Sequence, residues 1–232
     1  MQVEITSGTI YYEKKGQGEP LILLHGNGED HAIFQEAMEK LSSYFTVYAF
    51  DSPGHGQSMK VQEYHYDLLA ERLFEAFSVL GILPARIYGF SDGAILALLM
   101  KLQHPEAVET LLASGINLTP KELKFSWRVL FYLSNLFSKN PLVEMMLKEP
   151  HISYEDLATL PPSTIFLFGE RDLISKKRIL AMKKACPQGN FYLVKKENHG
   201  SYIVHQQKIA DILLFLLKKE LHSDDFFLKE IK

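Results

Sequence analysis

The chain has little of several features that mark particular classes of protein. Its single cysteine, Cys186, cannot form a disulfide within the chain, so nothing points to an oxidising compartment. Lysine and arginine number 25 against 28 aspartates and glutamates, which gives a net charge of −3. Because binding to nucleic acid depends on neutralising phosphates, the lack of a basic excess argues against a nucleic-acid partner.

Long apolar runs are also missing. The longest, Ala94–Met100 and Ile212–Leu217, have the length of buried helix segments, whereas a membrane span needs roughly 20 residues. The start of the chain, Met1–Glu4, lacks the basic and apolar stretches of a signal peptide. We therefore expect a cytoplasmic protein without a membrane span.

What is present is the composition of a globular protein, with 47% hydrophobic and 23% charged residues. Continuous apolar runs bounded by glycine or proline are typical of strands covered on both faces of a parallel sheet. Such runs are Pro20–Leu24, Phe45–Phe50, Arg86–Phe90, Thr110–Ser114, Thr164–Phe168 and Asn190–Val194. Helical patterns lie between them, at Ala32–Leu41, Tyr64–Leu80, Asp92–His104, Lys176–Ala185 and Ser201–Leu221.

This alternation predicts an α/β fold with a doubly wound, mostly parallel sheet. Two β-rich runs, Gln2–Thr6 and Thr9–Lys14, predict a hairpin before it. The tail Ser223–Lys232 mixes acids with apolar residues, and either a docked terminal turn or an oligomer contact fits that pattern.

One segment, residues 118–162, interrupts the alternation. About 45 residues are too few for an independent domain. We therefore expect a short helical lid insertion at 118–162, on a core formed by residues 1–117 and 163–232. Within the insertion, Trp127 and Phe131 are candidates for binding an apolar part of the substrate, although such side chains also pack a lid onto its core.

A glycine-flanked serine, Ser91, lies in the stretch Gly89–Gly93 (Gly-Phe-Ser-Asp-Gly). This stretch joins a predicted strand to a predicted helix, which is the context that a G-x-S-x-G nucleophile requires. A sharp turn of this kind strains the serine backbone and leaves no room for large neighbours. Ser91 is therefore the candidate nucleophile, and a chance glycine-rich turn is the plainer alternative.

The oxyanion of an acyl-transfer reaction needs two backbone N–H donors. One is expected from Asp92, directly after the nucleophile. The other is expected from Asn27 in the loop His25–Gly28 (His-Gly-Asn-Gly), with Gly28 as the alternative. Asn27 is also a candidate for binding substrate.

A nucleophilic serine needs a base and an acid that orients the base. His199 follows a predicted strand, which would place it at the same sheet edge as Ser91. Asp172 follows the run Thr164–Phe168, and Glu170 is the alternative acid. The order Ser91, Asp172, His199 is the order of the α/β-hydrolase triad.

Taken together, these motifs resemble the α/β-hydrolase fold over nearly the whole chain. A further stretch, Asp51–Ser58 (Asp-Ser-Pro-Gly-His-Gly-Gln-Ser), is similar to a structural loop of that family. The resemblance implies a carboxylesterase-like serine hydrolase that acts through an acyl-enzyme on a small, ester-like, partly apolar substrate, without a cofactor. It equally accommodates thioesterases, aminopeptidases and carbon–carbon bond hydrolases, and less readily a non-catalytic ligand receptor.

Asp92 has two interpretations. A carboxylate in the first turn of a helix is favoured by the helix dipole. The elbow is also similar to that of the valacyclovir-hydrolase branch, which implies recognition of a substrate ammonium group. The nine histidines form no H-x-x-x-H or H-E-x-x-H spacing, so no catalytic metal is expected.

Overall fold

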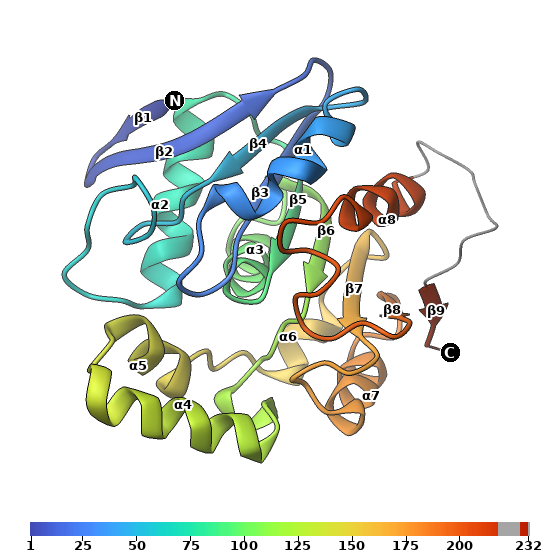
Figure 1. Ribbon diagram of the computed structural model, residues 1–232. Helices are drawn as coiled ribbons and strands as arrows, with labels where there is room; N and C mark the ends of the chain where they lie inside the picture. Colours follow the sequence, from blue (N-terminus) through green and yellow to red (C-terminus); the bar gives the residue numbers. More distant parts are fainter. Residues whose placement is uncertain (218–227, 232) are drawn as a thin grey trace.

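The computed structural model describes residues 1–217 and 228–231 (Figure 1). In these residues nine strands form one sheet in the order β1-β2-β4-β3-β5-β6-β7-β8-β9. Strands β3 to β8 run parallel to one another, and β1, β2 and β9 pair antiparallel at the two edges. The strands are β1 (Gln2–Ile5), β2 (Gly8–Lys15), β3 (Pro20–Leu24), β4 (Thr46–Phe50), β5 (Ala85–Phe90), β6 (Val108–Ser114), β7 (Thr164–Gly169), β8 (Asn190–Val194) and β9 (Leu228–Glu230).

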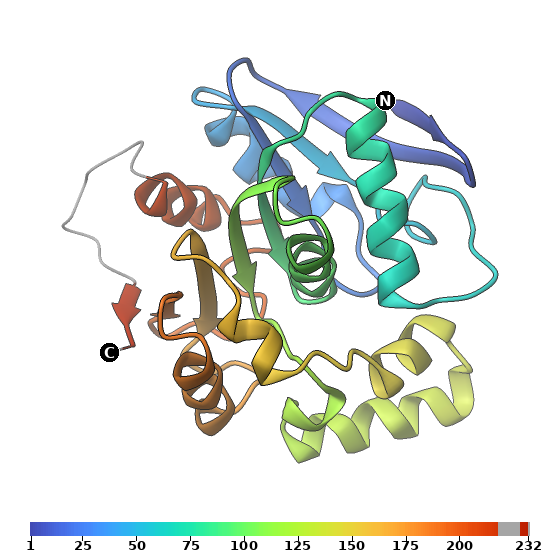
Figure 2. The same ribbon diagram turned by 180° about the vertical axis from the view of Figure 1, so that it is seen from behind.

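Helices cover both faces of the sheet, so the prediction of a doubly wound, mostly parallel sheet is confirmed. Helices α1 (Gln35–Leu41) and α8 (Lys208–Leu216) share one hydrophobic cluster with the sheet. Helices α2 (Tyr66–Val79), α3 (Asp92–Gln103) and α7 (Lys176–Ala185) share the cluster on the other face. Figures 1 and 2 show these two layers from opposite sides. Strands β4 and β7 are buried along their whole length, as expected for apolar runs covered on both faces.

The structure shortens one predicted helix and splits another. The helix expected over Ser201–Leu221 begins only at Lys208, because residues 201–205 form turns that end in a left-handed backbone at His205, with φ 51°. Residues 218–221 lie outside the described residues. Helix Ala32–Leu41 divides into a 3₁₀ turn, η1 (His31–Phe34), and α1.

Strand β9 was not predicted from the sequence. Its three residues pair antiparallel with β8, and so short an edge strand carries no readable periodicity. The rest of the tail considered above, residues 223–227 and 232, lies outside the described residues.

Residues 115–163 connect β6 to β7 and contain the elements that break the alternation. These are η2 (Pro120–Glu122), α4 (Phe125–Ser138), α5 (Pro141–Lys148) and α6 (Tyr154–Ala158). A backbone hydrogen bond from Lys124 N to Leu173 O ties the segment to the core, and one from Ile152 N to Leu118 O joins its two ends. Figure 1 shows α4 and α5 together at the bottom of the molecule, away from the hairpin β1–β2. None of the residues of α4 is buried.

Candidate active site

Ser91 occupies the sharp turn between β5 and α3. Its backbone is in a sparsely populated region, with φ 52° and ψ −114°, a conformation that costs of the order of 1–3 kcal/mol. The turn is held by a hydrogen bond of 2.8 Å from Ser91 N to Ser114 O on β6. A Cβ atom at Gly89 would lie 2.2 Å from the carbonyl oxygen of Gly93. Side chains at the flanking glycines would therefore force the turn open.

Three side chains from distant parts of the chain form a line of hydrogen bonds. Ser91 Oγ lies 3.1 Å from Nε2 of His199, and Nδ1 of His199 lies 2.7 Å from Oδ1 of Asp172. Because an ionised carboxylate only accepts hydrogen bonds, His199 Nδ1 carries the proton. Nε2 is then the acceptor that faces the Ser91 hydroxyl.

Asp172 is held in the orientation that this line requires. Its carboxylate is 1% exposed and accepts hydrogen bonds from Gly169 N at 2.9 Å and Ile174 N at 3.2 Å. Burial alone would raise the pKa of the Asp172 carboxyl, but the His199 charge and the hydrogen bonds outweigh burial and hold this pKa below its ordinary value. Glu170, the alternative acid, instead accepts from Lys196 N.

Gly115 sits directly against His199, a relationship that sequence reasoning missed. Its φ is 64°, and a Cβ atom built there would lie 2.6 Å from Cε1 of His199. Its N–H donates to Leu167 O at 2.8 Å. The sequence did offer a signal, because Gly115 comes immediately after β6, the strand that pairs with β5.

Two backbone N–H groups beside Ser91 are available to a ligand. Within the described residues, neither Asn27 N nor Asp92 N has a hydrogen-bond acceptor. The Asn27 side chain donates from Nδ2 to Asp92 Oδ2 at 2.8 Å and to Leu142 O at 3.2 Å. The loop after β3, the turn at Ser91 and helix α5 are thereby joined at one point.

A cavity of about 200 Å³ opens onto Ser91 and His199. Its walls are mainly apolar and come from both the core and the insertion. The remaining lining residues are Gly26, Asn27, Glu29, Phe90, Asn117, Leu123, Phe131, Val143, Met146 and Leu173. Of the two candidate substrate-binding aromatic residues, Phe131 lines the cavity. Trp127 does not, and packs against the Phe131 ring with a centroid distance of 5.9 Å.

Glu29 brings a carboxyl group to this cavity, and sequence reasoning missed it. Its Oε2 accepts a hydrogen bond from Gly26 N at 2.9 Å. Burial raises the pKa of the Glu29 carboxyl, an effect that the Gly26 hydrogen bond and the His199 charge oppose. The sequence signal for Glu29 was its position directly after the His-Gly-Asn-Gly loop, which is expected near the site.

Asp92 is not among the residues that line the cavity. Its side chain is buried beside Tyr66, whose hydroxyl has no partner at hydrogen-bond geometry within the described residues. Burial raises the pKa of the Asp92 carboxyl, and the hydrogen bond from Asn27 opposes this rise. The carboxylate that lines the cavity is that of Glu29, which supports a structural interpretation of Asp92.

The remaining motif residues hold loops in place. His25 Nδ1 donates to Gly26 O at 2.8 Å, and its Nε2 accepts from Ser52 N at 3.0 Å. Burial, followed by the nearby His55, lowers the pKa of His25 to about 4, so it is neutral at pH 7. Asp51, in the loop Asp51–Ser58, accepts hydrogen bonds from the backbone N–H groups of His31 and Gln57.

Asp30, His31 and Asp51 are the one group in the described part of the chain that could place three ligand atoms around a metal ion. Their atoms already have partners, however. Asp30 accepts from Ala32 N at 2.8 Å, and His31 Nδ1 bonds Asp51 at 2.6 Å. The group therefore works as a loop and helix cap. Separately, none of the helices in the described part of the chain has the length and apolar character that crossing a membrane requires.

Comparison with known proteins places this chain in a family. Residues 19–141, more than half of the chain, match the family model described as the alpha/beta hydrolase fold. A pimeloyl-[acyl-carrier protein] methyl ester esterase of Chromobacterium violaceum is 33% identical over 102 residues, which cover 44% of this chain and 39% of that protein. A similar enzyme of Vibrio cholerae is 32% identical over 120 residues, covering 51% and 45%. The chain thus spans less than half the length of these curated relatives.

Solved structures share the fold over nearly the full chain. A meta-cleavage product hydrolase from Pseudomonas fluorescens superposes with a TM-score of 0.78 at 18% identity, covering 94% of this chain and 97% of that one. Carboxylesterase CesB from Bacillus subtilis gives a TM-score of 0.78 at 18% identity, covering 95% and 92%. With the sheet order, the strained turn at Ser91 and the matching family model all in agreement, the chain belongs to the alpha/beta hydrolase fold family.

Proposed function

We propose that the protein is a serine hydrolase that cleaves a carboxylic ester of a small, partly apolar substrate. The observation that carries the proposal is the line Ser91–His199–Asp172, with distances of 3.1 and 2.7 Å, at the wall of a cavity. The N–H groups of Asn27 and Asp92, which have no acceptor among the described residues, support it as the two donors that an oxyanion needs. The curated relatives named as methyl ester esterases support an ester as the bond cleaved.

The proposed reaction follows from the hydrogen-bond directions. His199 Nε2 removes the Ser91 proton as Oγ attacks the ester carbonyl. The N–H groups of Asn27 and Asp92 stabilise the negative oxygen of the tetrahedral intermediate. Asp172 stabilises the charged imidazole, which then protonates the leaving alcohol. Water repeats these steps on the acyl-enzyme and releases the acid.

The cavity limits the acyl group. A volume of about 200 Å³ is below the range of roughly 300–1,000 Å³ typical of sites for drug-sized ligands. Phe131 from α4 and Met146 from α5 form part of its apolar wall, so the insertion acts as a lid in this proposal, at residues 118–162. We expect short acyl chains to fit, with the protein working in the cytoplasm on a small-molecule substrate.

The test is hydrolysis of p-nitrophenyl esters from acetyl to dodecanoyl. We expect turnover of the short esters, and a loss of about 10⁶-fold in Ser91→Ala, since the members of a triad act as a unit. Ser175→Ala is the matched control, because the Ser175 side chain makes no capping hydrogen bond. Wild-type turnover by Ser91→Ala would contradict the assignment.

The alternative enzymatic functions use the same triad but cleave a different bond of the substrate. If no ester in the series is cleaved, thioesters, aminoacyl amides and carbon–carbon substrates are the next series, and binding without turnover identifies a receptor. A fluorophosphonate probe separates a hydrolase of any of these types from a receptor. It would label Ser91 in an active serine hydrolase and leave a receptor unlabelled.

A further inference from the structure

Helix α4 presents an apolar surface that the described protein does not cover. Phe137 is 88% exposed and Phe125 is 75% exposed, and none of the helix residues is buried. A large apolar surface that is left exposed to water marks a site of interaction with another protein or a membrane. The exposed large apolar residues of α4 are Phe125, Trp127, Val129, Leu130, Tyr132, Leu133, Leu136 and Phe137.

The apolar surface is on the outer side of the helix. The least exposed residues, Arg128, Phe131 and Asn135, have the i, i+3, i+7 spacing of one helix face, which is the face toward α5. At 3.6 residues per turn, Leu133 and Phe137 lie on the opposite side. These side chains point away from the cavity at Ser91, so that cavity does not account for them.

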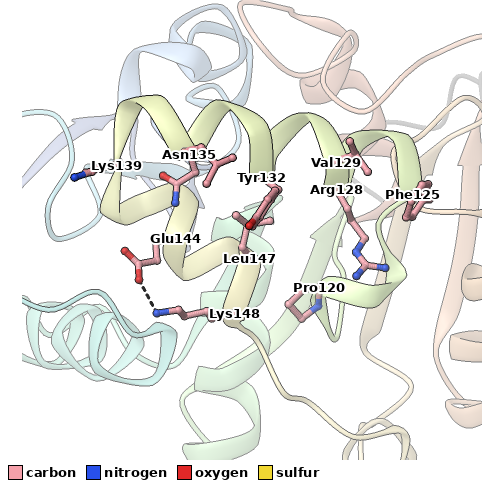
Figure 3. A pocket seen from close by; sticks show the side chains of 11 residues that line it. Pro120, Phe125, Arg128, Val129, Tyr132, Asn135, Lys139, Glu144, Leu147 and Lys148 are labelled. Carbon is pink, nitrogen blue, oxygen red and sulfur yellow. Dashed lines mark hydrogen bonds and ion pairs between the residues drawn. The ribbon is translucent and has the colours of Figure 1, made fainter.

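A groove continues this surface between α4 and α5. Its volume is about 680 Å³, and Tyr132 and Leu147 are among the residues that line it. Figure 3 shows Lys139 at one end of the groove and Arg128 toward the other, with Glu144 and Lys148 paired across a turn of α5. The groove is therefore apolar along its floor and basic at its ends.

The charge of this region differs from that of the rest of the chain. Residues 119–149 hold five lysines and arginines against three glutamates, whereas the remaining sequence holds 20 against 25. Glu122 accepts from Leu118 N and Tyr154, and Glu149 accepts from His65 and Tyr66 N. Within the described residues, the side chains of Lys121, Arg128 and Lys139 have no acidic partner.

We propose that α4 and this groove bind the surface of an anionic lipid bilayer. The helix would lie in the plane of the interface, with Leu133 and Phe137 among the acyl chains and with Arg128 and Lys139 near lipid phosphates. An apolar helix with flanking aromatic residues and cations is the pattern of interfacial binding. A second copy of the chain fits less well, because pairing the two faces would bring Arg128 and Lys139 of one copy close to the same cations of the other.

The chain carries its own probe for this contact. Trp127 is its single tryptophan and lies on α4, 39% exposed. With vesicles of phosphatidylglycerol we expect the protein to co-sediment and Trp127 emission to shift to shorter wavelength. With vesicles of neutral phosphatidylcholine we expect neither. High salt should weaken the binding, since it screens the attraction between exposed charges.

Variants separate the apolar and the charged contributions. Leu133→Glu with Phe137→Glu should abolish binding, while turnover of a soluble ester stays at the wild-type level. Arg128→Gln with Lys139→Gln should weaken binding roughly 30-fold, the effect of removing two cations near an anionic surface. Val79→Glu is the matched control, since Val79 on α2 is 60% exposed and distant from α4, and it should bind as wild type.

Several results would overturn the proposal. Wild-type protein that fails to bind phosphatidylglycerol vesicles is one, and equal binding to neutral vesicles is another. Sedimentation equilibrium in the absence of lipid supplies the third. A dimer that Phe137→Glu dissociates, together with no vesicle binding, would assign the face to a second copy.

Discussion

The amide of Asn27 donates a hydrogen bond of 2.8 Å to the carboxylate of Asp92, and it joins the loop after β3 to the first turn of α3, the two segments whose N–H groups are the proposed oxyanion donors. The positions of both N–H groups thus depend on one side-chain contact. Because Asp92 is buried, its carboxylate relies on partners within the protein rather than on water.

Removing this contact should reduce both stability and activity. Asn27→Ala leaves a buried carboxylate without its donor, which costs about 1–3 kcal/mol of unfolding free energy. Urea unfolding measures that cost, and kcat on a short p-nitrophenyl ester should fall at the same time. Asn190→Ala is the control, since its amide bonds Pro162 O far from the site. Unchanged stability and kcat in Asn27→Ala would refute the coupling.

Replacing Asp172 should affect catalysis more than folding. Asp172→Asn allows the amide to donate to His199, so the imidazole would present the wrong tautomer to Ser91. A loss of about 10⁴-fold in kcat is expected, which is the size of the loss for the equivalent change in a well-studied serine protease. Glu170→Gln should keep wild-type kcat. If Glu170→Gln were the slower variant, the acid would be misassigned.

Gly115 tests how closely the His199 ring is confined. Gly115→Ala places a Cβ atom 2.6 Å from Cε1 of His199, and displacement of the ring by about 1 Å should cost roughly 10²-fold in kcat. Gly81 is a matched control, with φ 63° and nothing within 4 Å of the added Cβ. Gly81→Ala introduces similar backbone strain but should retain kcat. Equal activity of the two variants would exclude the steric role of Gly115.

Glu29 should give a pH-dependent contribution to stability. Burial raises the pKa of its carboxyl in the folded protein, so the folded state binds the proton more tightly than the unfolded state. The contribution of Glu29 to stability therefore decreases as the pH rises from the ordinary glutamate pKa toward the folded one. Ionised Glu29 is thus unfavourable for folding at neutral pH.

Glu29→Gln keeps an acceptor for Gly26 N and removes the charge. Its Tm should exceed that of wild type at pH 8, and the difference should shrink as the pH falls below about 4, where the wild-type carboxyl is mostly protonated in both states. Thermal unfolding across this range measures the effect. Glu63→Gln, in an exposed loop, should leave Tm unchanged. A lower Tm for Glu29→Gln at pH 8 would show that the charge stabilises the fold.

Phe131 and Trp127 should differ in their effect on substrate choice. Phe131→Ala enlarges the cavity, so the preferred p-nitrophenyl ester should move to a longer acyl chain. Trp127 does not line the cavity, and Trp127→Ala should lower stability without moving the preferred length. The same shift in both variants would mean that the cavity extends to Trp127.

The sequence by itself determined the features that depend on neighbouring residues. The Gly-Phe-Ser-Asp-Gly turn can be recognised in the sequence because the sharp turn requires small residues only two positions from Ser91, at Gly89 and Gly93. The doubly wound sheet is legible because strands covered on both faces read as apolar runs, as β4 and β7 do. The order of Ser91, Asp172 and His199 is legible because each follows such a run.

Tertiary structure alone decided the features that join distant segments. It placed Glu29 in the cavity, set Gly115 against His199, and left Trp127 behind Phe131. It also ended the sheet with β9 and delayed the last helix to Lys208. These outcomes depend on how separate elements pack. No local periodicity encodes the distance between side chains that are many residues apart in the chain, or the direction in which each points.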